Sequence, residues 1–220
     1  AAETTKERVL KDGRIVIGIH NRAPWGYKKD GTGELIGWHP DLLKAAFAGA
    51  GIKQVDFEVT EFGALIPGLM AGRFDAVASG LSITPQRCQQ VAFGAPDLKT
   101  EDAAIVLSGN PKAIHSYADL AAKSDAIMGG GRGSNVIENA IAEGVPDDRI
   151  LKFPDIETNV AALRAGRIDA ALFSSPTVIG LLAGNKNPDL ERATPFTTQE
   201  KSISYIAIAF RKDDTDLRDL

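Results

Sequence analysis

The chain has 220 residues, a net charge of -4 and an apolar fraction of 44%, the composition of an ordinary globular protein with a buried core. Its length allows one large domain or two of about 100 residues each. The acidic balance argues against nucleic acid as a partner, because phosphate binding requires clustered Lys and Arg. No apolar run in the sequence approaches the ~18 residues that a membrane-spanning helix needs.

The sequence is poor in metal-binding side chains. Cys88 is the single cysteine, and the three histidines, at positions 20, 39 and 115, show no paired spacing. We therefore expect no disulfide, no metal site and no cofactor.

The two ends of the chain suggest processing. Residues 1–8 begin with small side chains followed by a polar stretch, as in a mature chain from which a signal peptide has been removed, and this indicates the periplasm. Leu220 falls inside an amphipathic helical pattern, so further helices are expected beyond it.

Short apolar runs alternate with helical patterns from Arg14 onward, which predicts βα units and mostly parallel sheets. A helix is expected to open at Pro40 and Asp41 and to end at residues 49–51, with Leu42, Leu43, Ala46 and Phe47 on its apolar face. The strands expected in this part of the chain and after it are residues 15–19, 55–59, 76–78 and 170–173, together with one that ends at Ile127.

An eight-residue unit occurs twice. Residues 69–76 read Leu-Met-Ala-Gly-Arg-Phe-Asp-Ala, and residues 163–170 read Leu-Arg-Ala-Gly-Arg-Ile-Asp-Ala, with six identities. Each copy ends an apolar helix at a glycine and then enters an apolar strand. Such joints are common in α/β folds, but one copy in each half of the chain favours two lobes built on one plan.

Two apolar runs are suited to carry the chain between such lobes. They are residues 100–107 on the way out and residues 203–210 on the way back. We expect residues 1–101 plus 206–220 to form lobe 1, residues 102–205 to form lobe 2, and a ligand to bind in the cleft between them.

Ligands of such sheets bind beyond the carboxyl ends of the strands, which selects several side chains of lobe 1. Arg22 and Trp25 follow the first strand, and the indole either stacks on a ligand or covers its own loop. Phe62 is either a second stacking face or a helix-entry staple. Gly80 lets the backbone approach a ligand closely. Arg87 follows a Thr84-Pro85 helix start, from which its guanidinium can bind a carboxylate in a bidentate manner unless it is a solvated surface residue.

Lobe 2 offers two further segments. Residues 129–135, Gly-Gly-Gly-Arg-Gly-Ser-Asn, combine exposed backbone amides with a capping hydroxyl on Ser134, which predicts an anion site for a carboxylate. Arg132 is counted among the expected ligand-binding residues of this segment. The segment lacks the Lys-Ser/Thr ending of a nucleotide-binding loop. Ser174, after the strand at 170–173, supplies a hydroxyl and no charge.

These features together resemble the periplasmic solute-binding proteins of amino-acid ABC transporters, over nearly the whole chain. The resemblance is strongest in residues 63–69 and in residues 80–87, Gly-Leu-Ser-Ile-Thr-Pro-Gln-Arg, and it extends to residues 91–96 and 209–214. Residues 61–64 and 85–88 are most similar to the ectoine-binding receptors. The resemblance implies a two-lobed type II fold, each lobe a mixed, mostly parallel sheet flanked by helices, with two hinge crossings.

The family pattern also implies roles for individual residues. Arg87 would hold the ligand carboxylate with help from Ser82 and Ser134, Gly80 would offer its carbonyl, and Trp25 and Phe62 would sandwich the ligand. Two departures stand out. Ser174 replaces the Asp that binds an α-ammonium group, and Arg22 replaces an acidic residue of the ectoine receptors, so the pattern favours a ligand with a second acidic or carbonyl group.

The resulting hypothesis is a monomeric receptor, not an enzyme, that delivers a small carboxylate-bearing solute to a membrane ABC permease. The solute would be an amino acid, an amino-acid derivative or an ectoine-like compatible solute. Two alternatives remain open at this point: a dehydratase-like enzyme on the same scaffold, with Glu61 as the only carboxylate near the strand ends, and a ligand-sensing domain.

Overall fold

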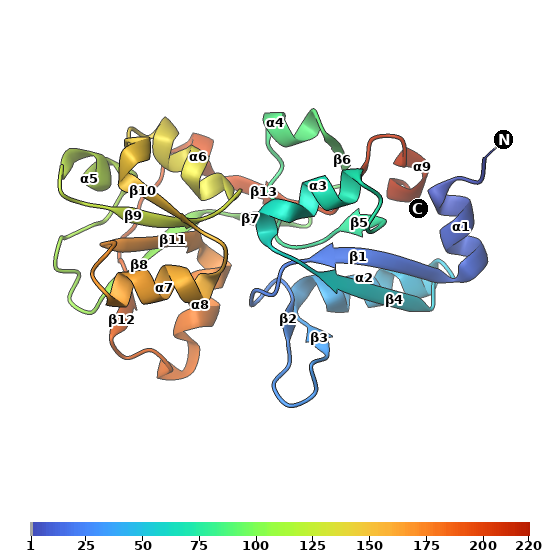
Figure 1. Cartoon of the computed structure of the whole chain (residues 1–220), viewed down its shortest axis with the longest axis horizontal. Coiled ribbons are helices and arrows are strands. Elements are labelled where there is room, and N and C mark those ends of the chain that lie inside the picture. Colours follow the sequence, from blue (N-terminus) through green and yellow to red (C-terminus); the bar gives the residue numbers. More distant parts are fainter. Residues whose placement is uncertain (1) are drawn as a thin grey trace. The chain divides into compact units, whose positions relative to one another are not determined.

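The computed structural model describes residues 2–220, and these divide into two compact units. Unit 1 comprises the chain up to Lys99 together with Tyr205–Leu220, and unit 2 is Thr100–Ser204. The chain passes from one unit to the other in β7 (Leu98–Thr100) and returns in β13 (Ser204–Ile206), and these two short strands pair with each other. Each unit has its own five-stranded sheet with helices on both faces (Figure 1).

The sheet of unit 1 has the order β4-β1-β5-β14-β6. Strand β1 runs parallel to its neighbours β4 and β5, whereas β14 is antiparallel to β5 and β6. The expected strands at residues 15–19, 55–59 and 76–78 are confirmed, and each observed end lies within one residue of the expected end. The bounds are β1 (Arg14–Ile19), β4 (Gln54–Val59), β5 (Ala76–Val77), β6 (Val91–Phe93) and β14 (Ala209–Arg211).

Helices pack on both faces of this sheet. One apolar cluster joins Ile15 and Ile17 to side chains of α1, α2 and α9, and a second joins Val77 to side chains of α3. The remaining elements of unit 1 are α1 (Thr5–Asp12), α2 (Trp38–Gly49), α3 (Leu65–Met70), α4 (Pro85–Cys88), α9 (Thr215–Arg218), the 3-10 turn η1 (Phe62–Ala64) and the hairpin of β2 (Tyr27–Lys28) and β3 (Leu35–Ile36).

Helix α2 corrects two expectations. It begins at Trp38, two residues before the expected start at Pro40, with Gly37 at its N-cap. Leu43 is 1% exposed and Phe47 packs against the core, but Leu42 is 37% exposed and Ala46 is exposed as well. Successive helical residues are about 100° apart, so the pair Leu43 and Phe47 takes the inner face and the adjacent pair turns outward.

The sheet of unit 2 has the order β10-β9-β11-β8-β12 and repeats the plan of unit 1. Strand β9 is parallel to β10 and β11, and β8 is antiparallel to β11 and β12. Helices α5 and α6 cover one face, and α7 and α8 cover the other. The bounds are β8 (Asp102–Leu107), α5 (Tyr117–Ala122), β9 (Met128–Gly131), α6 (Asn135–Ala142), β10 (Ile150–Phe153), α7 (Ile156–Arg164), β11 (Ala170–Ser174), α8 (Ser175–Leu182) and β12 (Leu190–Arg192).

The repeated eight-residue unit occupies equivalent places in the two sheets. Gly72 and Gly166 end α3 and α7 with φ angles of +76° and +70°, the left-handed conformation that favours glycine. Asp75 and Asp169 then each make two hydrogen bonds to the backbone of one residue, Val16 of β1 or Ile127 just before β9. The backbone N–H of each Asp donates to the carbonyl of Val16 or Ile127, at 2.8 and 2.7 Å, and the carboxylate of each accepts from the backbone N–H of that same residue, at 2.9 Å in both units.

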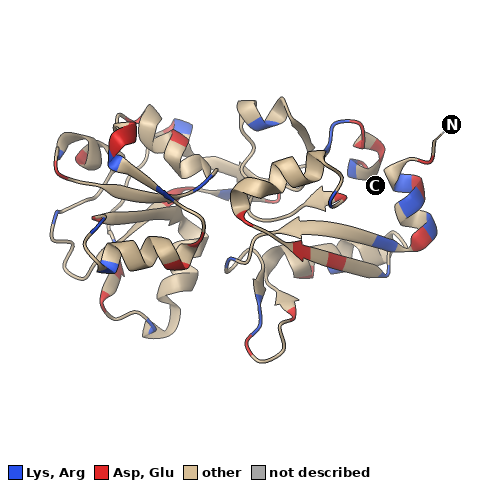
Figure 2. Cartoon of the chain, in the orientation of Figure 1, with Lys and Arg blue, Asp and Glu red and all other residues tan. Residues whose placement is uncertain are grey.

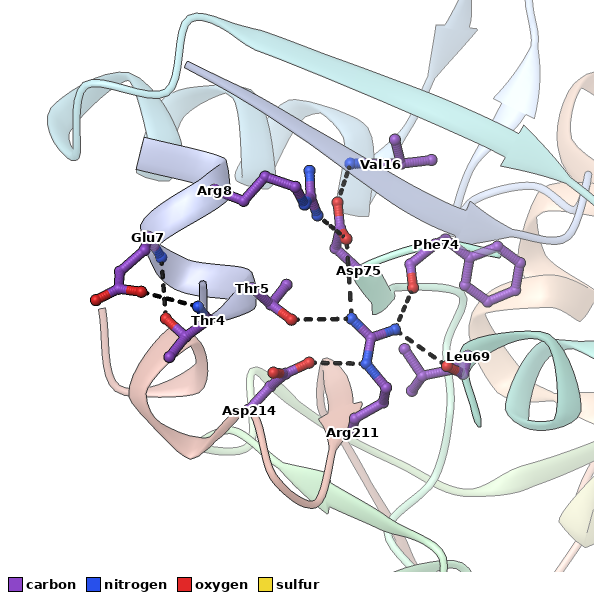
Figure 3. Close-up of polar contacts among 10 residues, drawn as sticks. All are labelled: Thr4, Thr5, Glu7, Arg8, Val16, Leu69, Phe74, Asp75, Arg211 and Asp214. Carbon is purple, nitrogen blue, oxygen red and sulfur yellow. Dashed lines mark hydrogen bonds and ion pairs between the residues drawn. The ribbon is translucent and has the colours of Figure 1, made fainter. Parts of the chain in front are cut away.

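Each of these aspartates is also paired with basic side chains. Figure 3 shows Asp75 between Arg8 of α1 and Arg211 of β14, whose guanidinium also donates to the carbonyls of Leu69 and Phe74. Asp169 accepts from Lys112 at 3.1 Å. The prediction of two lobes with one plan is therefore borne out in strand order, in the helix ends and in the hydrogen bonds of the repeat.

Candidate functional site

Three loops meet at the carboxyl ends of the parallel strands of unit 1. They follow β1, β4 and β5, and side chains tie them together. The backbone N–H of His20 donates to the Ser79 hydroxyl at 2.9 Å, and the His20 ring bonds to the Thr60 carbonyl, also at 2.9 Å. Arg22 Nη2 donates to the Ser79 carbonyl at 3.0 Å. The strand ends named by the sequence are thus brought to one edge of one sheet.

The ring of Phe62 lies at the centre of this edge. The Cζ atom of Arg22 is 4.8 Å from the ring centroid and that of Arg87 is 5.8 Å away. His20 meets the same ring edge-on, with 6.3 Å between the centroids. Phe62 is 8% exposed, so these contacts are largely withdrawn from water, where cation–π attraction is strongest. The structure therefore unites three of the predicted site residues, Arg22, Phe62 and Arg87.

Arg87 is held by the short helix α4, in whose first turn it lies. The prediction of a Thr84 cap followed by Pro85 in the first turn is confirmed, because the Thr84 hydroxyl accepts from the backbone N–H of Arg87 at 3.2 Å. The guanidinium donates through Nη1 to the carbonyl of Ser82 at 2.8 Å, and Arg87 is 8% exposed. Ser82 itself is 4% exposed, and it bridges to Ile206 in β13. Arg87 is therefore a buried, oriented cation and not a solvated surface residue.

Arg22 is a second cation at the same ring. Its Nη2 is used by Ser79, whereas its Nε is buried without a hydrogen-bond partner. Burial, with a further contribution from the charge of Arg87, lowers the pKa of Arg22 to about 10. Arg22 still carries its charge at neutral pH. The site therefore holds two guanidinium charges at close range.

Trp25 lies in a different environment from the one expected of a ligand sandwich. Its indole is 1% exposed and stacks on the ring of His39, with centroids 5.7 Å apart. Gly80, with φ +64°, packs against the same indole, because a Cβ atom there would come within 2.6 Å of it. The group that packs closely against Gly80 is thus the Trp25 indole. Of the two aromatic side chains predicted to sandwich a ligand, Phe62 is the one whose ring contacts guanidinium groups.

His39 links these residues to the first crossing strand. Its Nδ1 accepts from the backbone N–H of Gly80 at 3.3 Å, and its Nε2 lies 3.3 Å from Oδ2 of Asp97, the residue before β7. A ring that accepts at Nδ1 carries its hydrogen on Nε2, the tautomer that suits the carboxylate. His39 is fully buried, and nothing in the sequence pattern distinguished it from a core histidine.

The glycine segment of unit 2 corrects the expectation of a long loop. Residues 129–131 belong to β9 and pair with residues 151–153 of β10. A Cβ atom at Gly129 would lie 2.2 Å from Oδ1 of Asn159, and one at Gly130 would lie 2.9 Å from Ile137. These glycines let α7 and α6 pack closely on the sheet, which leaves only the turn at 132–134 outside it.

The remaining predicted residues of unit 2 lie at strand and helix ends. Ser134 caps α6, its hydroxyl accepting from the backbone N–H of Val136 at 3.2 Å, as expected. Arg132 donates its backbone N–H to the carbonyl of Phe153 at 2.8 Å. Ser174 ends β11, where its hydroxyl shares a 3.0 Å hydrogen bond with Thr177. The ligand contacts assigned to Arg132, Ser134 and Ser174 stay predictions.

A buried carboxyl that the sequence did not single out lies beside Ser174. Asp102 of β8 is its register partner and is 3% exposed. Its Oδ2 accepts from the Tyr117 hydroxyl at 2.7 Å and from Asn139 Nδ2 at 2.8 Å. Burial raises the pKa of Asp102 to about 6, although these two hydrogen bonds oppose the effect. Asp102 is the first residue of an apolar strand, and the sequence pattern gave no reason to select it as a site residue.

Among residues 2–220, no group of three or more His, Cys, Asp and Glu side chains is arranged to hold a metal ion. Over the same residues, no helix has the length and apolar character that crossing a membrane requires. Lys and Arg are interspersed with Asp and Glu in both units (Figure 2).

A family model of the bacterial extracellular solute-binding proteins, family 3, matches residues 15–220. The chain belongs to this family. The family match confirms the resemblance to solute-binding proteins that the sequence indicated.

Three similar members of the solute-binding family illustrate its range. The chain is 36% identical, over its full length and 73% of the relative, to a probable amino-acid ABC transporter periplasmic-binding protein, y4tE, of Sinorhizobium fredii. It is 30% identical, over 93% of its length and 80% of the relative, to ABC transporter arginine-binding protein 1 of Escherichia coli. The crystal structure of EhuB in complex with hydroxyectoine matches with a TM-score of 0.90 at 33% identity, covering 100% of this chain and 84% of that one.

These matches bear out the expected fold class and the expected similarity to amino-acid and ectoine receptors. The relatives are solute-binding transport proteins by name.

Proposed function

We propose that this solute-binding protein is the receptor of an ABC uptake system and that it binds a small carboxylate-bearing solute with Arg87 as the anchor. The solute is an amino acid, an amino-acid derivative or an ectoine-like compatible solute. The protein binds it and returns it chemically unchanged.

The observation that carries this proposal is the pair of guanidinium groups at the ring of Phe62. Arg87 is buried and held by its own helix cap, and Arg22 keeps a buried Nε without a partner. A buried cation is costly unless an anion or several acceptors compensate it. The planar fork of an arginine matches a carboxylate in a bidentate manner, so a carboxylate is the ligand group that best completes this edge.

The names of the relatives are consistent with this class. One is an arginine-binding protein, and another was crystallised with hydroxyectoine. Both ligands carry one carboxylate, although the rest of each molecule differs. We therefore propose that the carboxylate anchor is common to them and to this chain, while the neighbours of Arg87 set the choice of solute.

We also propose that the protein works outside the cytoplasm, as a monomer without a nucleic-acid partner, and that it passes its solute to a membrane ABC permease. The family consists of extracellular solute-binding proteins, and the Sinorhizobium relative is named as a periplasmic one of an ABC transporter.

A thermal-shift screen tests the proposal. The panel contains L-amino acids, opines, ectoines and small dicarboxylates, because a compound that binds only the native state must raise its melting temperature. We expect at least one carboxylate to do so, and we expect Arg87→Gln to abolish that rise. Arg73→Gln is the matched control, since Arg73 lies 5.7 Å from the Phe74 ring but is paired with Glu58 on the surface.

Two results would contradict the proposal. One is a panel without any stabilising compound. The other is an Arg87→Gln protein that still responds as the wild type does. Melting temperatures and circular dichroism measured without ligand establish that each variant is folded, and Arg87→Lys tests whether charge without the planar fork restores any of the response.

A further inference from the structure

Two contacts fix the peptide bond between Ser79 and Gly80, here called the 79–80 peptide, just after β5. Its carbonyl oxygen, on Ser79, accepts from Arg22 Nη2 at 3.0 Å, and its N–H, on Gly80, donates to His39 Nδ1 at 3.3 Å. The C=O and N–H groups of a trans peptide point in opposite directions within one rigid plane. A rotation of this peptide therefore breaks both contacts together.

Gly80 makes the orientation of the 79–80 peptide depend on those contacts. Its φ is +64°, and glycine adopts positive and negative φ about equally well, so backbone sterics do not select the observed orientation over a flipped one. Ser79 is fully buried, and Gly80 is buried as well. The N–H of Gly80 therefore needs an acceptor within the protein, and the imidazole of His39 supplies it.

His39 is itself held in one orientation. It is fully buried in the first turn of α2, and its ring stacks on the indole of Trp25 with 21° between the two planes. Its Nε2 lies 3.3 Å from Oδ2 of Asp97, whose backbone N–H donates to the carbonyl of Ile206 at 2.8 Å. Because a backbone N–H can only donate, the ring nitrogen that faces Gly80 carries a lone pair, and the ring hydrogen lies on the nitrogen that faces the carboxylate.

The start of α2 also holds the loop from which Arg22 extends. The backbone N–H of His39 lies in the first turn, where no acceptor exists within the helix, and it donates to the carbonyl of Trp25 at 2.9 Å. That loop is closed by two backbone hydrogen bonds between Arg22 and Gly26, at 2.7 and 3.1 Å. His39 therefore supports Arg22 twice, through the loop that carries it and through the peptide that accepts its hydrogen bond.

We propose that His39 is a positioning residue of the solute site, which acts through the 79–80 peptide to keep the guanidinium of Arg22 in one orientation. This inference rests on the proposed function, because Arg22 is one of the residues expected to bind the solute. Without the acceptor on His39, the peptide is free to turn its carbonyl away from Arg22, and the guanidinium then samples several directions. Solute binding weakens although every side chain expected to contact the solute is unchanged.

Two substitutions of similar shape separate the hydrogen bond from packing. Asn and Leu both branch at Cγ, but only Asn offers an oxygen in the place of Nδ1. NMR without any solute reports both ends of the peptide, through hydrogen exchange of the Gly80 N–H and ¹⁵N relaxation of the Arg22 Nε–H. In His39→Leu we expect Gly80 to exchange about tenfold or more faster than in wild type, and the Arg22 order parameter to fall below about 0.6. His39→Asn should keep both values close to those of wild type.

Isothermal titration with L-arginine, L-glutamate, octopine, ectoine and succinate is the second readout. For each probe that binds wild type, we expect the dissociation constant to rise about tenfold in His39→Leu and to stay within about threefold in His39→Asn, as for the loss and the retention of one buried hydrogen bond. The control is Phe47→Leu, which changes the packing of the same helix on the core and should leave Arg22 ordered and the dissociation constants unchanged. Circular dichroism and urea titrations establish that each variant is folded.

Three results would overturn the inference. An Arg22 side chain that stays ordered in His39→Leu would show that the peptide does not depend on the imidazole. A His39→Asn protein as impaired as His39→Leu would show that the ring acts by packing alone. A hydrogen on Nδ1 of His39 in ¹H–¹⁵N correlation spectra of wild type would exclude the contact with Gly80 without any variant. If none of the five probes binds wild type, that result counts against the proposed function, whereas the NMR comparison, made without solute, still decides the role of His39.

Discussion

Replacing Asp102 by Asn should stabilise unit 2 at neutral pH. Asp102 is buried, and its carboxylate has two neutral donors, Tyr117 and Asn139, and no cation. The pKa of Asp102 is about 6 in the folded protein against 3.8 for an ordinary Asp. A difference of about two in pKa corresponds to about 3 kcal/mol between the two protonation states.

The sign follows from proton binding. The folded state holds the Asp102 proton more tightly than the unfolded state, so between about pH 4 and pH 6 folding takes up a proton. The contribution of Asp102 to stability is therefore fully present below pH 4 and is lost as the pH rises through 6. At pH 7.5 the ionised, buried carboxylate lowers the free energy of unfolding by about 3 kcal/mol relative to its protonated form.

An asparagine keeps the acceptor and removes the charge. Both donors bond to Oδ2, so the amide oxygen can take that position while the amide nitrogen replaces Oδ1. Asp102→Asn is therefore expected to be more stable than wild type at pH 7.5 by up to about 3 kcal/mol, with most of the gain absent at pH 4.

Hydrogen exchange of the β8 and β9 amides measures this effect in unit 2 directly, because it reports the free energy of opening around each amide. Tryptophan fluorescence would not, since Trp25 and Trp38 both belong to unit 1. The control is Asp189→Asn, whose surface carboxyl has a pKa held below its usual value by Arg164 and so does not titrate between pH 5 and 7.5. A difference between Asp102→Asn and wild type that is the same at pH 4 and pH 7.5 would refute the reasoning.

Two predictions concern glycines. Gly72→Ala and Gly166→Ala should each lower the free energy of unfolding by about 1 kcal/mol in urea titrations, because φ is positive at both positions but a Cβ atom meets open space. A much larger loss at one of them would show that the two helix ends are not equivalent. Gly80→Ala should cost about 2 kcal/mol or more and change Trp25 fluorescence, since its Cβ would collide with the indole at 2.6 Å; an unchanged emission spectrum would contradict that contact.

The elements that the sequence predicted well are those decided by local chemistry. The repeat at residues 69–76 and 163–170 specified a left-handed glycine and an entry into a buried strand, and both occur twice. The Thr84-Pro85 start of α4 and the Ser134 cap of α6 likewise depend on a hydroxyl and the two or three residues after it.

The elements that it missed depend on partners distant in the chain. The glycines at 129–131 read as a loop by composition, but helix packing by Asn159 and Ile137 requires them within a strand. For Trp25 the sequence left two interpretations open, stacking on a ligand or covering its own loop, and it gave no sign that the indole packs on the ring of His39.

The same limit applies to the candidate site. Arg22, Phe62 and Arg87 could each be selected as residues that follow a strand, yet their meeting at one ring depends on the order of β4, β1 and β5 in the sheet. The missing acceptor at the Arg22 Nε is a property of three-dimensional packing that no local pattern records.

The central claim is that this protein binds one small carboxylate-bearing solute and returns it unchanged. Isothermal titration of the most stabilising compound from the screen, followed by chemical recovery of that compound after hours with the protein, tests the claim most directly. We predict saturation at one molecule per chain and recovery of the intact compound. Turnover of the compound, or binding without a defined stoichiometry, would contradict a receptor.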